Sequence, residues 1–112
     1  MILLDAKRIR NDFPRVVAKA HASLMTKSGE FGESLGPLIN QLVDLTLITR
    51  STCLELLDRE YIFVTVLPHI DDGTPSWSWH IDEARGEGFS LREQAEMAGI
   101  YKGFELLEKK LI

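Results

Sequence analysis

Two histidines and several carboxylates flank a turn-forming stretch in the second half of the chain. Side chains of these types can bind metal ions or take part in acid–base catalysis. His69 is followed by Asp71 two residues later, and His80 is followed by Asp82 at the same spacing. Such groups can ligate a divalent metal, or supply a general base with its orienting acid. The spacing matches no established zinc-ligand or metalloprotease pattern. The alternative is that these residues only form a turn and the solvent-facing side of a strand.

A second pattern, residues 32–36 (Gly-Glu-Ser-Leu-Gly), matches the G-x-S-x-G elbow that presents a catalytic serine in hydrolases. That elbow needs a strand before it, whereas a glycine-rich polar stretch precedes Ser34. The chain is also too short for the usual hydrolase sheet. We therefore expect a loop between helices. The sequence contains no Walker loop, dinucleotide fingerprint or EF-hand loop either, so no cofactor is expected.

Basic residues gather near the amino-terminal end. Residues 1–27 carry a net charge of +4 within a chain of net charge −4, so the remainder carries −8. On a helix, Arg8, Arg15 and Lys19 share an outward face that could contact phosphates. The whole chain is nevertheless acidic and shows no established nucleic-acid-binding motif. Nucleic-acid contact is therefore one alternative, beside a solvated face or contact between the two oppositely charged parts of the chain.

The elements that must position these residues begin with a hairpin. Residues 61–67 are dense in β-branched and aromatic side chains, residues 68–75 supply turn chemistry, and residues 77–82 alternate between apolar and polar. This predicts a two-stranded antiparallel hairpin, which Gly86 and Gly88 end. Alternation places Trp77, Trp79 and Ile81 on one side, where burial is the favoured role and contact with a protein partner or base stacking the alternatives. The other side is polar: Ser76, Ser78, His80 and Asp82.

The spacing of apolar residues predicts three helices. Asp5 is a suitable N-cap for the first, which we expect to continue through Pro14 as one kinked element. Residues 28–36 then break the chain, and Pro37 begins a second helix that runs to about residue 58. Residues 1–112 are expected to form a single α+β domain of order α-α-β-β-α.

The third helix is predicted from a reciprocal cap between Ser90 and Glu93. Gly99 and Gly103 within it each cost about 1 kcal/mol relative to alanine, which suggests close approach by a neighbouring element. A lone hairpin is only marginally stable in water. We therefore expect the helices to pack against it, and the sheet could extend across a dimer.

With no complete catalytic set, the favoured function is a non-enzymatic protein–protein interaction or regulatory protein, homodimeric and with a further protein partner. The alternatives are a nucleic-acid-binding accessory protein and a small hydrolase or metal-binding protein that uses the hairpin His and Asp residues. A lone Cys53, no signal peptide and no long apolar run predict a cytoplasmic protein outside the membrane. The expected contact surface consists of Leu47, Ile48, Trp77, Trp79, Ile100, Phe104, Leu107 and Leu111.

Overall fold

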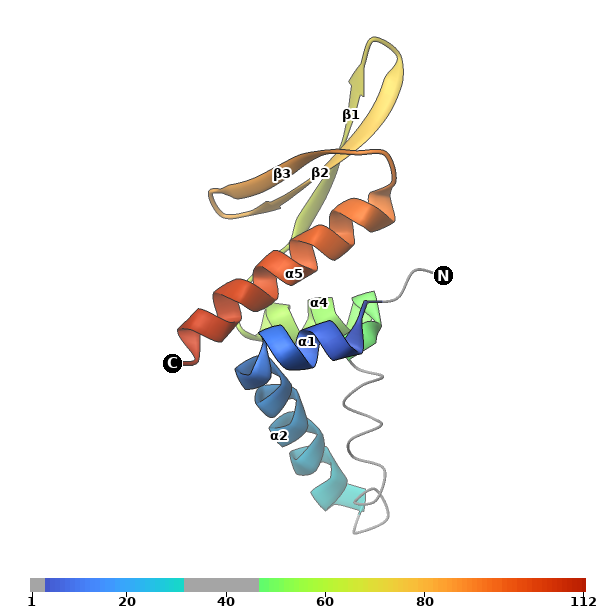
Figure 1. Ribbon diagram of the computed structural model, residues 1–112. Coiled ribbons are helices and arrows are strands. Elements are labelled where there is room, and N and C mark those ends of the chain that lie inside the picture. Colours follow the sequence, from blue (N-terminus) through green and yellow to red (C-terminus); the bar gives the residue numbers. More distant parts are fainter. Residues whose placement is uncertain (1–3, 32–46) are drawn as a thin grey trace.

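The computed structural model describes residues 4–31 and 47–112, and these residues form an α+β fold (Figure 1). Three strands form one antiparallel sheet in the order β1-β2-β3. The expected class is confirmed, but the sheet has three strands where two were expected. The described helices are α1 (Ala6–Asp12), α2 (Pro14–Phe31), α4 (Arg50–Arg59) and α5 (Arg92–Lys110), and the strands are β1 (Thr65–Asp71), β2 (Thr74–Ile81) and β3 (Ala84–Phe89).

Helix α5 lies at the centre of the fold. Figure 1 shows the sheet on one side of it and α1 with α4 on the other, while α2 extends away from the sheet. Ile100, Phe104 and Leu107 of α5 are completely buried, and the Phe104 ring packs 5.8 Å from that of Phe13. A helix that is covered on both sides needs apolar residues on more than one face, which explains why its stripe is wide.

The two glycines of α5 lie where neighbouring elements come close, as the sequence predicts. A Cβ atom on Gly99 would lie 2.6 Å from Cγ1 of Val64, and one on Gly103 would lie 2.7 Å from Cδ1 of Leu57. Neither distance leaves room for a methyl group. The helix thus loses some intrinsic stability at both positions, and in return the sheet and α4 pack directly on its backbone.

The β1–β2 hairpin turns only at Asp72 and Gly73, which have φ values of 50° and 78°. Asp71 pairs with Thr74 across this two-residue loop. In such a hairpin the flanking residues form a hydrogen-bonded pair, and bonded and non-bonded pairs alternate from there. Pro68 and Pro75 fall on non-bonded positions, so their missing N–H groups face away from the partner strand. Both prolines therefore lie within strands, and the expected turn over residues 68–75 is too long.

The third strand was not expected, because Gly86 and Gly88 favour a turn. Here Gly86 belongs to β3, and its backbone lies so close to the Trp79 indole that any Cβ atom would collide with the ring. The register shifts between Trp77 and Trp79, which marks a bulge, and Gly88 has a φ of 82°. Gly86 thus makes room for a large aromatic side chain, and Gly88 supplies a positive φ near the bulge, so neither glycine ends the sheet.

The expected single kinked helix is in fact two helices. Asp5 caps α1 as predicted, since its carboxylate accepts hydrogen bonds from the main-chain N–H groups of Lys7 (3.0 Å) and Arg8 (3.2 Å). Phe13 leaves helical geometry, with φ −130° and ψ 58°. Pro14 then begins α2, because its ring clashes with a preceding helical turn. Helix α2 continues to Phe31, so the expected break starts at least four residues too early.

The other two helices also begin differently from the prediction. Helix α4 begins at Arg50, after an extended Thr49, and the expected helical residues 37–46 lie outside the described residues, as does Ser34. Helix α5 begins at Arg92 with Leu91 as its N-cap residue, without a side-chain cap. The Ser90 hydroxyl instead contacts Oε1 of Gln94 at 3.3 Å, so the predicted reciprocal cap with Glu93 is wrong.

Candidate functional site

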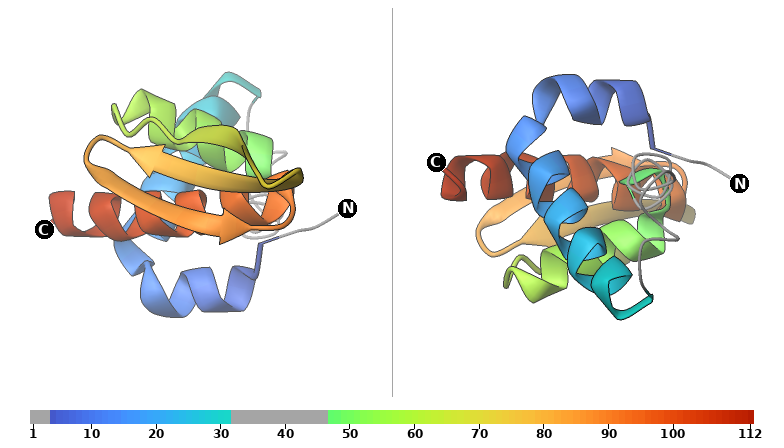
Figure 2. Two further views of the ribbon diagram at one scale, coloured as in Figure 1. Left: turned by 90° about the horizontal axis from the view of Figure 1, so that it is seen from above. Right: turned by 90° about the horizontal axis from the view of Figure 1, so that it is seen from below.

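One face of the sheet packs on α5, and no described helix covers the opposite face (Figure 2). Trp79 and Ile81 are buried on the α5 side, as strand alternation predicts. The side chains of His69, Ser78 and His80 share the open face. Any group that this sheet offers to solvent or to a partner must come from the open face or from the two edge strands.

Two imidazoles converge on one buried hydroxyl on this open face. The Oγ atom of Ser78 lies 2.6 Å from Nε2 of His69 and 2.8 Å from Nε2 of His80, and the Ser78 side chain is completely buried. A hydroxyl has one proton and two lone pairs, so Ser78 can donate to one imidazole while accepting from the N–H of the other. The three residues thereby form a directional chain of hydrogen bonds across β1 and β2.

A serine beside an imidazole is also the core of a nucleophilic site. Such a site needs an accessible hydroxyl, a group that orients the base, and donors for an oxyanion. Here Ser78 has no exposed surface. In the part of the chain that the structure describes, neither His69 nor His80 is hydrogen-bonded to a carboxylate. The arrangement therefore supports a hydrogen-bond network that holds two strands together better than it supports acyl transfer.

The four residues considered for a metal site are not brought together as a set. Only His69 and His80 converge, through Ser78. Asp82 lies in the β2–β3 turn with a φ of 50°, and the side chain of Asp71 lies outside the described part of the structure. Among described residues, no group of three or more His, Cys, Asp or Glu side chains could hold a metal ion.

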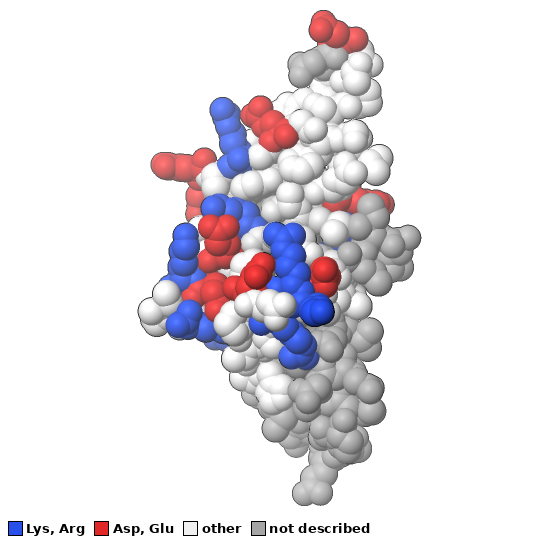
Figure 3. All heavy atoms as spheres, viewed as in Figure 1, with Lys and Arg blue, Asp and Glu red and all other residues white. Residues whose placement is uncertain are grey.

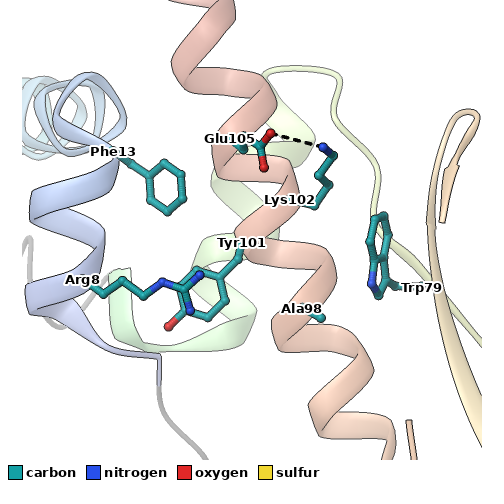
Figure 4. A pocket seen from close by; sticks show the side chains of 7 residues that line it. All are labelled: Arg8, Phe13, Trp79, Ala98, Tyr101, Lys102 and Glu105. Carbon is teal, nitrogen blue, oxygen red and sulfur yellow. Dashed lines mark hydrogen bonds and ion pairs between the residues drawn. The ribbon is translucent and has the colours of Figure 1, made fainter. Parts of the chain in front are cut away.

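A groove of about 380 Å³ runs along α5 between α1 and the sheet (Figure 4). The Arg8 guanidinium lies 4.1 Å above the Tyr101 ring, a cation–π contact, and the Tyr101 hydroxyl accepts a hydrogen bond from the Asp5 main-chain N–H at 3.0 Å. Lys102 pairs with Glu105 at 3.2 Å. The charged side chains of the groove thus already bind one another or join α1 to α5. Its lining residues are Arg8, Phe13, Trp79, Ala98, Tyr101, Lys102 and Glu105.

The three predicted nucleic-acid contacts each have a carboxylate partner. Arg8 pairs with Asp12 at 3.6 Å, Arg15 with Glu108 at 3.7 Å, and Lys19 with Glu60 at 3.2 Å. Figure 3 shows Lys and Arg side chains mixed with Asp and Glu over the middle of this face. The pairs of Arg15 and Lys19 join the basic amino-terminal part to the acidic remainder, which was one of the three interpretations of the charge asymmetry, whereas the pair of Arg8 lies within α1 and so within the amino-terminal part.

Glu108 does more than neutralise Arg15. Its Oε1 and Oε2 atoms accept hydrogen bonds from the main-chain N–H groups of Arg15 and Val16, both at 2.9 Å. These are first-turn donors of α2, which has no partner for them within the helix. A residue near the end of α5 thus caps the start of α2, and its negative charge suits the helix dipole there.

Most residues of the expected contact surface are buried within this chain. Leu47, Trp79, Ile100, Phe104 and Leu107 belong to its own core, with at most 8% of any of them exposed. Ile48, Trp77 and Leu111 are half-buried. The apolar stripe of α5 therefore packs on the chain's own sheet and helices, and in this fold those five residues present no surface to a partner. Cys53 is also buried, where its Sγ lies 3.0 Å from the Leu47 carbonyl oxygen and burial raises the pKa of its thiol to about 12.

The large apolar side chains that are exposed gather in a different place. Among described residues, four of the six lie between positions 61 and 70: Tyr61 (80% exposed), Phe63 (56%), Leu67 (43%) and Ile70 (76%). We call these four residues the β1 surface, although only Leu67 and Ile70 belong to β1 and the other two lie in the segment that leads into it. No Asp, Glu, Lys or Arg occurs from 61 to 70. This surface was not expected from the sequence, although Tyr61, Phe63 and Leu67 alternate with buried or half-buried neighbours as strand residues do.

The two edges of the sheet differ in how they are protected. β3 carries the charged side chains Arg85 and Glu87 and a bulge opposite β2, which are common devices against edge-to-edge pairing. β1 carries Pro68 within it and one charged residue, Asp71, at its end beside the hairpin turn. The β3 edge is therefore protected against a further strand, while the β1 edge has no charged residue before Asp71.

Comparison with known protein families, with curated proteins and with solved structures finds no match. Over the described residues, no helix has the length and apolar character that a bilayer span requires.

Proposed function

We propose that this chain is a non-enzymatic protein-interaction protein whose contact surface is the β1 surface. The observation that carries the proposal is the concentration of exposed apolar side chains over residues 61–70, which lead into and form most of the edge strand β1 and contain no Asp, Glu, Lys or Arg, while the other edge is charged and bulged. Clusters of exposed apolar residues on folded proteins are typical of interaction sites. Edge strands with free main-chain groups are a common place for a partner to bind.

The size of the apolar contribution supports this proposal. Full burial of a large apolar side chain contributes about 1.5–3 kcal/mol, and each member of the β1 surface is 43–80% exposed. Covering all four would therefore contribute about 5 kcal/mol before the cost of association is subtracted. Main-chain hydrogen bonds along β1 would in addition fix the direction and register in which a partner strand binds.

Neither alternative function gains a comparable observation. A nucleic-acid-binding role would bring phosphates to Arg8, Arg15 and Lys19, each of which already pairs with a carboxylate that would repel them. A hydrolase would need the buried Ser78 to become accessible. The β1 surface needs no rearrangement, since its side chains already face solvent.

Site-specific photo-crosslinking tests the proposal. A photoreactive p-benzoylphenylalanine replaces Phe63 on the β1 surface, and the matched control carries it in place of Arg85 on the opposite edge. We expect irradiation in cells that naturally make this protein to give discrete covalent adducts from position 63 and none from position 85. Adducts of equal yield from both positions, or none from position 63, would contradict the proposed surface.

A further inference from the structure

We propose that the partner bound at the β1 surface is a second copy of this chain, with the two β1 strands paired antiparallel in one continuous six-stranded sheet. This inference rests on the proposed function, because it names the occupant of the same surface. Its strand order would be β3-β2-β1 in one copy followed by β1-β2-β3 in the other, so both bulged and charged edges would lie on the outside.

The first argument comes from the main-chain groups on the free edge. Alternation from the Asp71–Thr74 pair directs the N–H and C=O groups of Val66 and Ile70 away from β2. Pro68 lies between them and presents only its carbonyl oxygen. An open edge of this kind offers donors and acceptors to an antiparallel strand, but the missing donor at Pro68 restricts which registers are useful.

A two-fold register centred on Leu67 uses these groups best. It places each Val66 N–H opposite the Pro68 carbonyl of the other copy, and each Ile70 opposite Val64. Centring the pair on Pro68 would put two nitrogens without protons opposite one another. Centring it on Val66 would put Ile70 opposite Ile62, whose N–H is already bonded to the Leu57 carbonyl at 2.9 Å. Pro68 thus selects one register instead of preventing pairing.

Side-chain chemistry fits the same register. On the open face of the sheet, Leu67 would meet Leu67 of the second copy, and Thr65 would meet His69. Opposed residues in a non-hydrogen-bonded pair lie about 4.5 Å apart between Cα atoms, where like charges are destabilising. Because residues 61–70 contain no Asp, Glu, Lys or Arg, two copies of net charge −4 can approach there without opposing charged side chains.

The surface area that dimerisation could bury indicates how tightly the two copies would bind. Aromatic side chains bury about 150–250 Å² each, so the exposed parts of the β1 surface amount to roughly 400 Å² per copy. With the main chain, the dimer would bury about 1,000 Å², just below the range of about 1,200–2,000 Å² for stable specific interfaces. We therefore expect a reversible dimer that dissociates in the micromolar range.

Sedimentation velocity of the purified full chain, from about 1 to 200 μM, tests the association. Wild type should shift from monomer to dimer, and Leu67→Lys should weaken dimerisation at least tenfold, because it puts two ammonium groups on the two-fold axis. Leu91→Lys is the matched control, since Leu91 is a similarly exposed leucine (51%) outside the β1 surface, and it should dimerise like wild type. A monomeric wild type, or a Leu67→Lys variant as dimeric as wild type, would overturn the inference.

Engineered cysteines test the register. Leu67→Cys places two thiols at the two-fold axis, within the 4.4–6.8 Å Cα separation of disulfides, whereas Thr65→Cys places them roughly 14 Å apart. Mild oxidation should give a disulfide-linked dimer of Leu67→Cys and not of Thr65→Cys, while buried Cys53 stays unreactive. Efficient linkage of Thr65→Cys would refute this register. A monomeric purified chain that still crosslinks to a different protein from position 63 would refute the second copy and leave the proposed function standing.

Discussion

Replacing Gly99 by alanine tests whether the close packing of α5 on the sheet limits stability. Two effects oppose one another in this variant. Alanine is favoured over glycine within a helix by about 1 kcal/mol. The new Cβ atom would, however, lie 2.6 Å from Cγ1 of Val64 and 3.1 Å from Cβ of Trp79. Neither neighbour is the free end of a flexible side chain, so the backbones must separate.

The packing effect should outweigh the helix propensity. Overpacking a well-packed interior costs about 1–3 kcal/mol, and the gain of about 1 kcal/mol from alanine offsets part of it. We expect Gly99→Ala to lower the free energy of unfolding by about 1 kcal/mol, which corresponds to a Tm about 4 °C lower for a domain of this size. Helix propensity alone predicts the opposite, that Gly99→Ala raises the free energy of unfolding.

A double-mutant cycle identifies the cause. Val64→Ala removes the Cγ1 atom that the new methyl group meets first. In the Val64→Ala background, Gly99→Ala should be close to neutral or stabilising, so the two substitutions should show a coupling energy of about 1–2 kcal/mol. Urea unfolding monitored by circular dichroism measures all four proteins. A stabilising Gly99→Ala in wild type, or an equal cost in both backgrounds, would refute the packing argument.

Three further predictions concern single groups. Glu108→Gln should destabilise the fold by about 1 kcal/mol in urea unfolding, because it weakens the cap of α2 and removes the charge that faces Arg15; an unchanged midpoint would show that water replaces the cap. Because burial raises the pKa of Cys53 to about 12, its thiol ionises at a lower pH in the unfolded chain than in the folded one. The free energy of unfolding should therefore fall between pH 9 and about 12, by up to about 1.4 kcal/mol per pH unit. Cys53→Ala should lack that alkaline component. A hydrogen bond from Lys102, together with the charges of Lys102 and Lys109, lowers the pKa of Glu105. Ionised Glu105 therefore stabilises the fold at pH values above its pKa in the unfolded chain, and this stabilisation is lost as the pH falls through its pKa in the folded chain. Glu105→Gln should therefore lose less stability than wild type on acidification, as Tm values from pH 6 to 3 would reveal.

The features of this fold that local chemistry determines could be predicted from the sequence. Asp5 caps a helix because a carboxylate suits the first-turn donors, and Gly99 interrupts a good helix only where something must come close. Alternation in β2 correctly separated Trp79 from His80. In each case the explanation lies within a few residues along the chain, or in the cost of an unusual residue type.

The features that were missed depend on contacts between distant residues. Gly86 favours a turn locally, yet it belongs to a strand because the Trp79 indole occupies the space where a side chain would be. Pro68 and Pro75 are compatible with strands only because those positions face free edges, which depends on the final strand order. The near-repeat around His69 and His80 was noticed, but a serine on a strand carries no sign that two imidazoles will converge on it.

The cap that Glu108 provides also bears on when the protein can complete its fold during synthesis. The carboxylate and the two amides that it binds are more than 90 positions apart, and Asp5 and Tyr101 are joined over a similar separation. A nascent chain therefore emerges from the ribosome with the start of α2 lacking its acceptor until Glu108, more than 90 positions later, has also emerged. Since contacts between distant segments form slowly, docking of the first two helices should follow the emergence of α5, and chaperones would meet those helices before α5 arrives.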